Sequence, residues 1–492
     1  MVEPTISPAG SAAGSVVLSG VTVVDTRDGS LRTNMDIALE AGRIVGIAPV
    51  AAGPRDPAAT TIDAAGRFVV PGYLDMHAHA LELEDPSDTL ELMLANGITG
   101  FRQMSGSAKL LQQRQSGTLP LPQDSPALLA MPGAVLTPAN AGTAGAAIAT
   151  VRDQKAAGAD FIKVGFVTPA VFFQAQAEAN RLGIPIGGHL PTGIDVVAAS
   201  DAGIRFIEHL GPGVGILAAC STDEAGVRQA LAALPPLAAP PSTIPPPPGA
   251  PPAAFPSPDP WLMRKFVMNP SARSTPADMA ILQRAVSTFS DEKCRALAAT
   301  FVADGTWQCP TLMRELTNEL CDAPAFRDDP NLRYVDPSTV EEWAEVADAF
   351  GRRAPAERAT FRAAYAVQLE LTRLFDEAGV KMLAGSDVTG AAWEVPGFSL
   401  HQEFDELAKA GLSPLHVLQM TTLHGAEFLG TTADMGAVEA GKVADLVLLD
   451  ANPVESVDNL HAISGVVRAG RYYSSADLEA MKSRVATSRS VR

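Results

Sequence analysis

The sequence predicts an α/β protein with a (β/α)8 TIM-like barrel and a small β-sandwich domain built from both chain ends. The chain has 492 residues, of which 47% are hydrophobic and 19% are charged, so it can bury a large core. Short β-branched runs punctuated by glycine and proline occur near both ends. Between them, apolar runs alternate with segments of helical periodicity, a pattern that indicates βαβ units and a parallel sheet.

The two β-rich ends are predicted to form one small domain from residues 15–70 and 430–475. The first range contains VVLSGVTVVD and RFVVPG, and the second contains KVADLVLLD and ISGVVRAGRYY. These runs indicate strands joined by hairpins. Since neither end can fill a core alone, we expect them to pair.

Residues 71–429 are predicted to form the barrel. Counting the short apolar runs yields about eight candidate strands, the number that such a barrel requires. They lie near residues 69–79, 97–104, 128–136, 161–166, 184–189, 205–209, 307–313 and 380–387.

Two insertions are predicted within the barrel. Residues 235–260 hold 13 of the chain's 39 prolines, a composition that favours polyproline II with few core contacts. A second, helical insertion is expected near residues 311–375, between strands seven and eight, where it could also cap the site.

The charge balance bears on the choice of partners. Asp and Glu number 55 against 37 Lys and Arg, which makes the formal net charge -18. Such a charge repels phosphate backbones and anionic membranes, so neither nucleic acid nor a membrane is an expected partner. A secretory signal pattern is not evident, and the cytoplasm is the expected location.

The cysteine spacing indicates neither a disulfide framework nor a thiolate zinc site. No C-x-x-C pair occurs, and four cysteines are few for this length. We therefore expect all four to be reduced core residues: Cys220, Cys294, Cys309 and Cys321.

Five candidate metal ligands fall where predicted strands end, the face on which barrel active sites assemble. They are His77 and His79 in GYLDMHAH, His189 in GGHLP, His209 in IEHL and Asp387 in LAGSDVTG. Residues two apart in a strand point to one side, so the first two histidines can bind one cation. Imidazole and carboxylate together suit Zn²⁺ or related divalent ions.

Lys163 in FIKVGF is a sixth candidate, because an ammonium among apolar residues is costly to bury. It could instead extend outward or form a salt bridge.

Two residues are candidates for substrate contact. Arg102 in GFRQM could place a positive charge near the mouth, with a structural salt bridge as the equal alternative. His401 in PGFSLHQE follows strand eight closely, although its amphipathic run favours a helix start.

These motifs, in this order, resemble those of the metal-dependent amidohydrolase superfamily. The resemblance rests on VVPGYLDMHAH, FIKV, GGHLP, IEHL, AGSD and GAVEAGKVADLVLLDANP, and it extends from about residue 15 to residue 473. More narrowly, GIPIGGHLP, ASDAGIRFIEHL, WQCPTL and PGFSLHQE are similar to the imidazolonepropionase-related branch, which includes Xaa-Pro dipeptidases and aryl-amide or carbamate hydrolases. Dipeptidase-like members use a histidine beside strand three, whereas MPGAVLTPANAG contains none.

The resemblance implies a site for two divalent metal ions, most commonly zinc. It assigns His77, His79 and Asp387 to one ion, and His189 and His209 to the other. A carboxylated Lys163 and a hydroxide would bridge the two. Asp387 would then accept the proton of the hydroxide and deliver it to the leaving nitrogen.

The implied activity is hydrolysis of an amide, carbamate or imidodipeptide bond in a small molecule, and homo-oligomers are compatible with it. One alternative is a mononuclear deaminase or cyclic-amide hydrolase on the same fold, for which Lys163 would be incidental. A second is a non-catalytic scaffold that binds partners through the proline-rich insertion.

Overall fold

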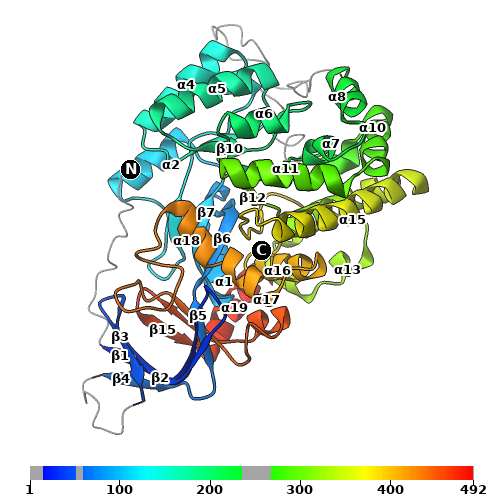
Figure 1. Cartoon of the computed structure of the whole chain (residues 1–492). Coiled ribbons are helices and arrows are strands. Elements are labelled where there is room, and N and C mark those ends of the chain that lie inside the picture. Colours follow the sequence, from blue (N-terminus) through cyan, green and yellow to red (C-terminus); the bar gives the residue numbers. More distant parts are fainter. Residues whose placement is uncertain (1–14, 51–58, 235–266, 491–492) are drawn as a thin grey trace, which may run out of the picture.

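The computed structural model describes residues 15–50, 59–234 and 267–490, which form a mixed α/β structure (Figure 1). The proline-rich insertion predicted at 235–260 lies outside the described residues. Among the helices that are described, none is long and apolar enough to cross a membrane.

Both chain ends contribute to one eight-stranded sheet, in which the blue N-terminal strands and the red strand β15 lie together (Figure 1). The strand order is β15-β14-β13-β5-β1-β2-β3, with β4 paired to β1. The strands are β1 (Val16–Val24), β2 (Leu31–Glu40), β3 (Arg43–Pro49), β4 (Thr60–Asp63), β5 (Phe68–Pro71), β13 (Leu446–Leu449), β14 (Ile463–Arg468) and β15 (Arg471–Ser474).

The join between the two ends is the antiparallel pair β13–β5, in which Leu448 lies opposite Val69. Buried apolar side chains from both ends, among them Leu18, Ile37 and Leu446, form one cluster on this sheet. Burial of these side chains explains why segments separated by more than 350 residues associate. The expected pairing of the ends is thus observed as one hydrogen-bonded sheet, and the sandwich stays a prediction.

The central region contains two parallel sheets, of orders β6-β7-β8 and β12-β11-β10-β9. Their strands overlap the first seven predicted barrel strands, although β8 ends at residue 130 and β12 at residue 309, before the predicted ends at 136 and 313. They are β6 (Tyr73–Ala78), β7 (Ile98–Gln103), β8 (Ala127–Ala130), β9 (Ile162–Val164), β10 (Ile186–Gly188), β11 (Phe206–Glu208) and β12 (Trp307–Cys309).

Isolated parallel bridges join these sheets where continuous pairing is absent. Leu136, in the segment that follows β8, forms one such bridge with Val164 of β9. The eighth predicted segment, 380–387, is not a continuous strand but is held by two bridges, Gln308 to Met382 and Ala78 to Val388. Its backbone departs from the extended form at Asp387, where φ is +58°. The bridges follow the strand order of a barrel, whose full closure stays a prediction.

Helices follow most of the parallel strands, as α4, α5 and α6 do in Figure 1. Helix α5 (Pro169–Leu182) illustrates why they form. The Thr168 side chain accepts a hydrogen bond from the Val171 N–H, and Gly183 ends the helix with φ +62°. Its buried residues recur at helical spacing and face the core. The other helices of this part are α1 (Ser87–Ala95), α2 (Ala108–Ser116), α3 (Pro138–Ala141), α4 (Ala144–Ala156), α6 (Val196–Asp201), α7 (Gly215–Ala219), α8 (Glu224–Ala232), α10 (Pro276–Ser287) and α11 (Asp291–Asp304).

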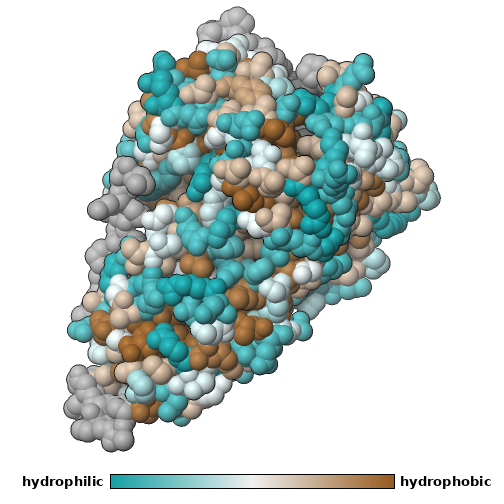
Figure 2. Space-filling model, viewed as in Figure 1, coloured by the Kyte–Doolittle hydropathy of each residue, from teal (hydrophilic) through white to brown (hydrophobic). Residues whose placement is uncertain are grey.

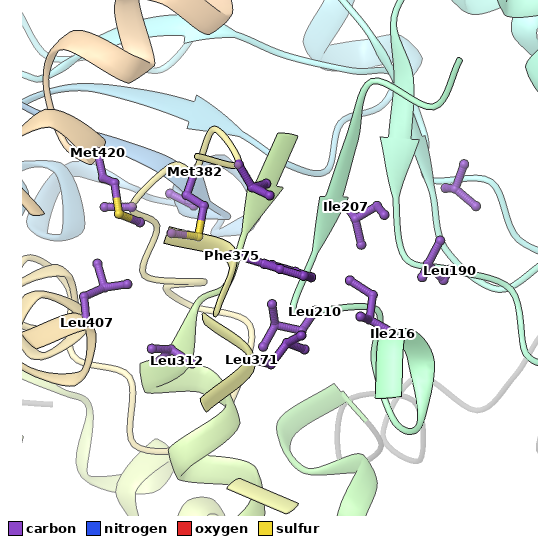
Figure 3. Packing of buried hydrophobic residues seen from close by; sticks show 14 of the residues in the cluster. Leu190, Ile207, Leu210, Ile216, Leu312, Leu371, Phe375, Met382, Leu407 and Met420 are labelled. Atoms are coloured by element: carbon purple, nitrogen blue, oxygen red, sulfur yellow. The ribbon is translucent and has the colours of Figure 1, made fainter. Parts of the chain in front are cut away.

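Helices also fill the insertion predicted near 311–375. They are α12 (Leu312–Glu319), α13 (Pro324–Arg327), the 3-10 helix η3 (Pro330–Tyr334), α14 (Pro337–Gly351) and α15 (Pro355–Glu377). Leu371 and Phe375 of α15 pack with Ile207, Leu210 and Leu312 in the main core (Figure 3). The insertion is therefore part of the core that supports the ends of β11 and β12.

After the insertion the chain forms α16 (Phe398–Lys409), α17 (Pro414–Met420), α18 (Leu423–Leu429) and the C-terminal α19 (Ser475–Ser490). Leu478 and Met481 of α19 pack against Leu94 and Tyr473. On the face shown in Figure 2, hydrophilic residues are interspersed with apolar ones. Large exposed apolar side chains include Leu31, Val45, Leu83, Val197, Val267 and Val302.

The expectation that all four cysteines are reduced is wrong for two of them. Cys220, after α7, and Cys294, in α11, form a disulfide across 74 residues of sequence. Cys309 and Cys321 are free and buried. The spacing of the cysteines did not predict the pair, because only the packing of α7 against α11 brings the two sulfurs together.

Replacing Cys220 and Cys294 together by alanine should lower the free energy of unfolding by about 2–4 kcal/mol, because a cross-link restricts the unfolded chain. Urea unfolding followed by circular dichroism measures this difference. Reductant added with the urea should destabilise the parent protein and leave the variant unchanged. Alkylation and mass spectrometry that find four free thiols in the parent protein would contradict the disulfide.

Candidate metal centre

The strand ends bring His77, His79 and Asp387 together. His77 is in β6, His79 follows that strand directly, and Asp387 lies in the segment bridged to it. The Oδ1 atom of Asp387 lies 2.9 Å from His77 Nε2 and 3.0 Å from His79 Nε2. One ligand atom from each residue lies within 4.8 Å of the others. The three side chains can thus surround a single cation.

His189 and His209 lie next to this group. The ring centroid of His209 lies 4.5 Å from that of His77 and 5.2 Å from that of His189. His209 is buried and His189 half-buried, and burial holds the pKa of each well below its ordinary value. They are therefore neutral imidazoles, the form in which histidine binds metal.

Lys163, in the middle of β9, is 2% exposed, and its Nζ has no hydrogen-bond partner among the described residues. Burial lowers its pKa to about 8, although Glu208 and Asp387 partly offset that effect. The sequence left open that the Lys163 side chain extends into solvent, and its burial excludes this alternative. A buried lysine amine with no partner indicates that something else completes its surroundings.

The glycines of GGHLP are needed for this packing. A Cβ atom on Gly188, where φ is +126°, would lie 2.5 Å from the Val164 carbonyl oxygen and 2.8 Å from Lys163 Cδ. Any larger residue would push β10 away from β9. The motif thus places His189 next to the lysine.

The donor set fits divalent metal ions. A further buried ring nitrogen, His189 Nδ1, has no hydrogen-bond partner in the described part of the chain. Burial raises the pKa of Asp387, but the neighbouring His77 and His209 outweigh it and hold the pKa well below its ordinary value. Burial also lowers the pKa of His77, whereas at His79 burial is outweighed by Glu82 and Asp387, which raise the pKa to about 10. Imidazoles together with an ionised carboxylate are a donor set that zinc and related ions prefer.

Sequence reasoning missed four polar residues that contact this group. Arg314 Nε lies 2.5 Å from Asp387 Oδ2. The Nδ1 atoms of three histidines each meet an oxygen. The pairs are His77 with Glu208 Oε2 at 2.5 Å, His79 with Glu82 Oε1 at 2.6 Å, and His209 with Thr311 Oγ1 at 2.5 Å. The sequence did contain signals for three of these residues. Glu208 adjoins His209 in IEHL, and Thr311 and Arg314 follow strand seven in WQCPTLMRE.

The structure does not place Arg102 near the mouth. Its side chain is 0% exposed, its Nε donates to the Met76 carbonyl oxygen, and its NH2 donates to Glu208 Oε1, each at 2.6 Å. The guanidinium also lies 4.8 Å from the centre of the Phe206 ring. The sequence offered a substrate contact or a structural salt bridge for Arg102. The structure shows the salt bridge, because β7 directs this side chain into the interior.

His401 lies in the first turn of α16, in agreement with the predicted helix start. It is 7% exposed, with Nε2 2.9 Å from the Asn96 carbonyl oxygen and Nδ1 3.0 Å from His461 Nδ1. Burial lowers its pKa to about 3, so the ring is neutral. None of these partners is a candidate metal ligand, and the structure does not bring His401 into the metal centre.

His401→Phe should lower the free energy of unfolding by about 1–3 kcal/mol, because the buried Asn96 carbonyl would lose its donor. The turnover of the folded variant should stay within a few-fold of the parent value. Thermal unfolding and steady-state kinetics measure the two effects. An unchanged stability with a large rise in KM would instead assign His401 to substrate binding.

Comparisons with known proteins find similarity to amidohydrolases and to a deaminase. A model of the amidohydrolase family matches residues 368–473, a stretch that contains Asp387 and the strands β13 and β14. An adenine deaminase from Rubrobacter xylanophilus is 36% identical over 70 residues, which are 14% of this chain and 12% of that protein. The chain therefore matches only a small part of the length of this curated relative.

Solved structures match over nearly the whole chain. A bottromycin amidohydrolase is 24% identical, with a TM-score of 0.67 over 96% of this chain and 90% of its own. A Xaa-Pro dipeptidase with bound methionine is 17% identical, with a TM-score of 0.58 over 94% of this chain and 100% of its own. The amidohydrolase-family match thus covers the segment that contains Asp387, and the chain is similar in fold to these two solved structures over nearly its whole length.

Proposed function

We propose that this protein is a metal-dependent hydrolase that cleaves an amide, carbamate or imidodipeptide bond in a small molecule. The observation that carries the proposal is the convergence of His77 Nε2, His79 Nε2 and Asp387 Oδ1 at the ends of parallel strands. The names of the solved relatives, an amidohydrolase and a dipeptidase, support the class of bond. As part of the same proposal, residues 71–429 form a closed barrel, and residues 15–70 and 430–475 together form a β-sandwich.

His77, His79 and Asp387 would hold one divalent ion, and His189 and His209 would hold a second, with zinc as the ion that these donors favour. A carboxylated Lys163 would serve as the ligand shared by the two. Such ions supply a hydroxide at neutral pH and polarise a carbonyl group.

The environment of Lys163 supports carboxylation. Its buried Nζ has no hydrogen-bond partner among the described residues, and its lowered pKa makes the neutral amine accessible near neutral pH. The lone pair of that amine adds to carbon dioxide, and the nitrogen releases one proton. The product is an anion, which removes the cost of a buried ammonium.

Asp387 is suited to move the proton of the reaction. Its Oδ1 faces His77 and His79, and its Oδ2 faces Arg314. Contacts on both oxygens orient the carboxylate, which would accept a proton from the attacking water and return it to the leaving nitrogen. His79 is the most exposed of the three ligands, so substrate would enter from its side.

A panel assay on protein reloaded with Zn²⁺ after chelation tests the proposal. The panel should contain Xaa-Pro dipeptides, N-acyl amino acids, aryl amides, carbamates and lactones. We expect turnover of at least one C–N substrate that chelation abolishes and metal restores. Metal-replete protein without turnover on any class would favour the scaffold alternative.

A deaminase is the second candidate, because the match to an adenine deaminase favours it. Release of ammonia from aminopurines or aminopyrimidines distinguishes it from hydrolysis of an acyclic amide. A deaminase with one metal ion would also leave Lys163 without a role. The partnerless amine of Lys163 is the reason to prefer the binuclear hydrolase.

A further inference from the structure

The partners of the three Nδ1 atoms differ in burial. Glu208, which contacts His77, is 0% exposed, whereas the side chain of Glu82, which contacts His79, is 46% exposed. Interactions in the interior are weakened less by solvent than those at the surface. Thr311, which contacts His209, is also 0% exposed, but its hydroxyl is uncharged, and hydrogen bonds to an ionised group are stronger. The contact of Glu208 with His77 is therefore the one that can hold an imidazole ring most firmly.

Glu208 is itself held in place by a buried arginine. Its Oε2 lies 2.5 Å from His77 Nδ1, and its Oε1 accepts from Arg102 at 2.6 Å. Arg102 is fixed in turn by the Met76 carbonyl oxygen and by the rings of Phe206 and Phe428. Because Glu208 and Arg102 are both 0% exposed and form an ion pair at 2.6 Å, the guanidinium stabilises the carboxylate form of Glu208.

We propose that Glu208, held by Arg102, is a positioning residue that sets the tautomer and the ring orientation of His77. An ionised carboxylate can only accept hydrogen bonds, so the proton of the neutral imidazole lies on Nδ1. The lone pair of Nε2 then faces Asp387 and His79. This inference rests on the proposed function, since an imidazole oriented in this way before binding has a higher affinity for a divalent cation.

A purely structural role of the Arg102–Glu208 pair makes a different prediction. Replacing both members of a buried ion pair by apolar residues of similar size is often neutral or stabilising. If the pair only fills the core, such a variant keeps both the His77 tautomer and the metal affinity. If the pair positions His77, the variant folds but loses both.

The test is the double variant Arg102→Met/Glu208→Met, which leaves no unpaired charge. In metal-free protein, ¹⁵N NMR of the histidine side chains should show the Nδ1–H form of His77 in the parent and its loss in the variant. The signal is assigned by its absence in His77→Gln. The affinity for Zn²⁺, measured by competition with a chelator, should fall by about 10- to 100-fold.

Two single variants complete the experiment. Glu208→Gln keeps the shape of the side chain, so it tests the proposal if the double variant does not fold, and it should also weaken Zn²⁺ binding. Glu82→Gln is the matched control on His79, and its affinity should fall less because Glu82 is more exposed. Parental zinc affinity together with an unchanged His77 signal in the Glu208 variants would overturn the proposal. If the parent protein binds no zinc, the proposed function fails, while the NMR signal of metal-free protein still decides the role of Glu208.

Discussion

Asp387→Asn should lower kcat by about 10²- to 10⁴-fold, the usual contribution of a general acid and base. The amide has the same shape and can still coordinate weakly through its oxygen, but it cannot accept and return a proton. Much of the metal should therefore remain bound, and KM should change less than kcat. Steady-state kinetics with parallel elemental analysis measures both effects.

Asp434→Asn is the matched control, because Asp434 forms an exposed ion pair with Arg43 at 2.9 Å. Exposed pairs contribute about 0–1 kcal/mol to stability, so this variant should keep its turnover and metal content. An Asp387→Asn protein with parental kcat would remove Asp387 from the mechanism. Joint loss of metal and activity would make it a ligand only.

Lys163→Ala should lose bound metal and activity together. If a carbamate on Lys163 is shared by two ions, elemental analysis of the parent protein should find about two divalent ions per chain. The alanine variant lacks the anion that would join the two halves of the site. Electron density of the parent protein should extend beyond Nζ by a planar carboxylate group.

Short carboxylates offer a rescue of this variant. Acetate or propionate with excess Zn²⁺ should restore part of the activity by supplying the missing anion. Lys442→Ala is the control, because Lys442 Nζ contacts Glu439 and lies outside the metal centre. Undiminished turnover in Lys163→Ala, with one metal ion bound, would favour the mononuclear deaminase.

Several elements were predictable because they depend on local patterns. The positions of seven parallel strands follow from short apolar runs between helical segments, and the structure has strands at all seven. The eighth segment has the same composition but is held by isolated bridges. A Cβ on Gly385 would lie 2.5 Å from His77 Cβ, so this segment packs very closely against β6. Its backbone conformation depends on that contact, and the pattern of apolar residues does not reveal it.

The candidate ligands were predictable for a similar reason. His77, His189 and His209 lie at or next to the ends of parallel strands, and those ends meet on one face of the fold. The alternation of side chains along a strand then predicts which neighbours point together. Both signals are present in the order of residues along the chain.

By itself the sequence determined the alternating α/β architecture, the pairing of the two chain ends and the set of histidine, lysine and aspartate candidates. Only the tertiary structure decided that Arg102 pairs with Glu208, 106 residues away, and that Cys220 pairs with Cys294. It also decided that Glu208 contacts His77 across 131 residues. The periodicity of apolar residues predicts on which side of a helix or strand a residue lies. Which residue it contacts on that side depends on which elements pack together. The orientation of each imidazole depends on that partner, so it could not be predicted from the sequence.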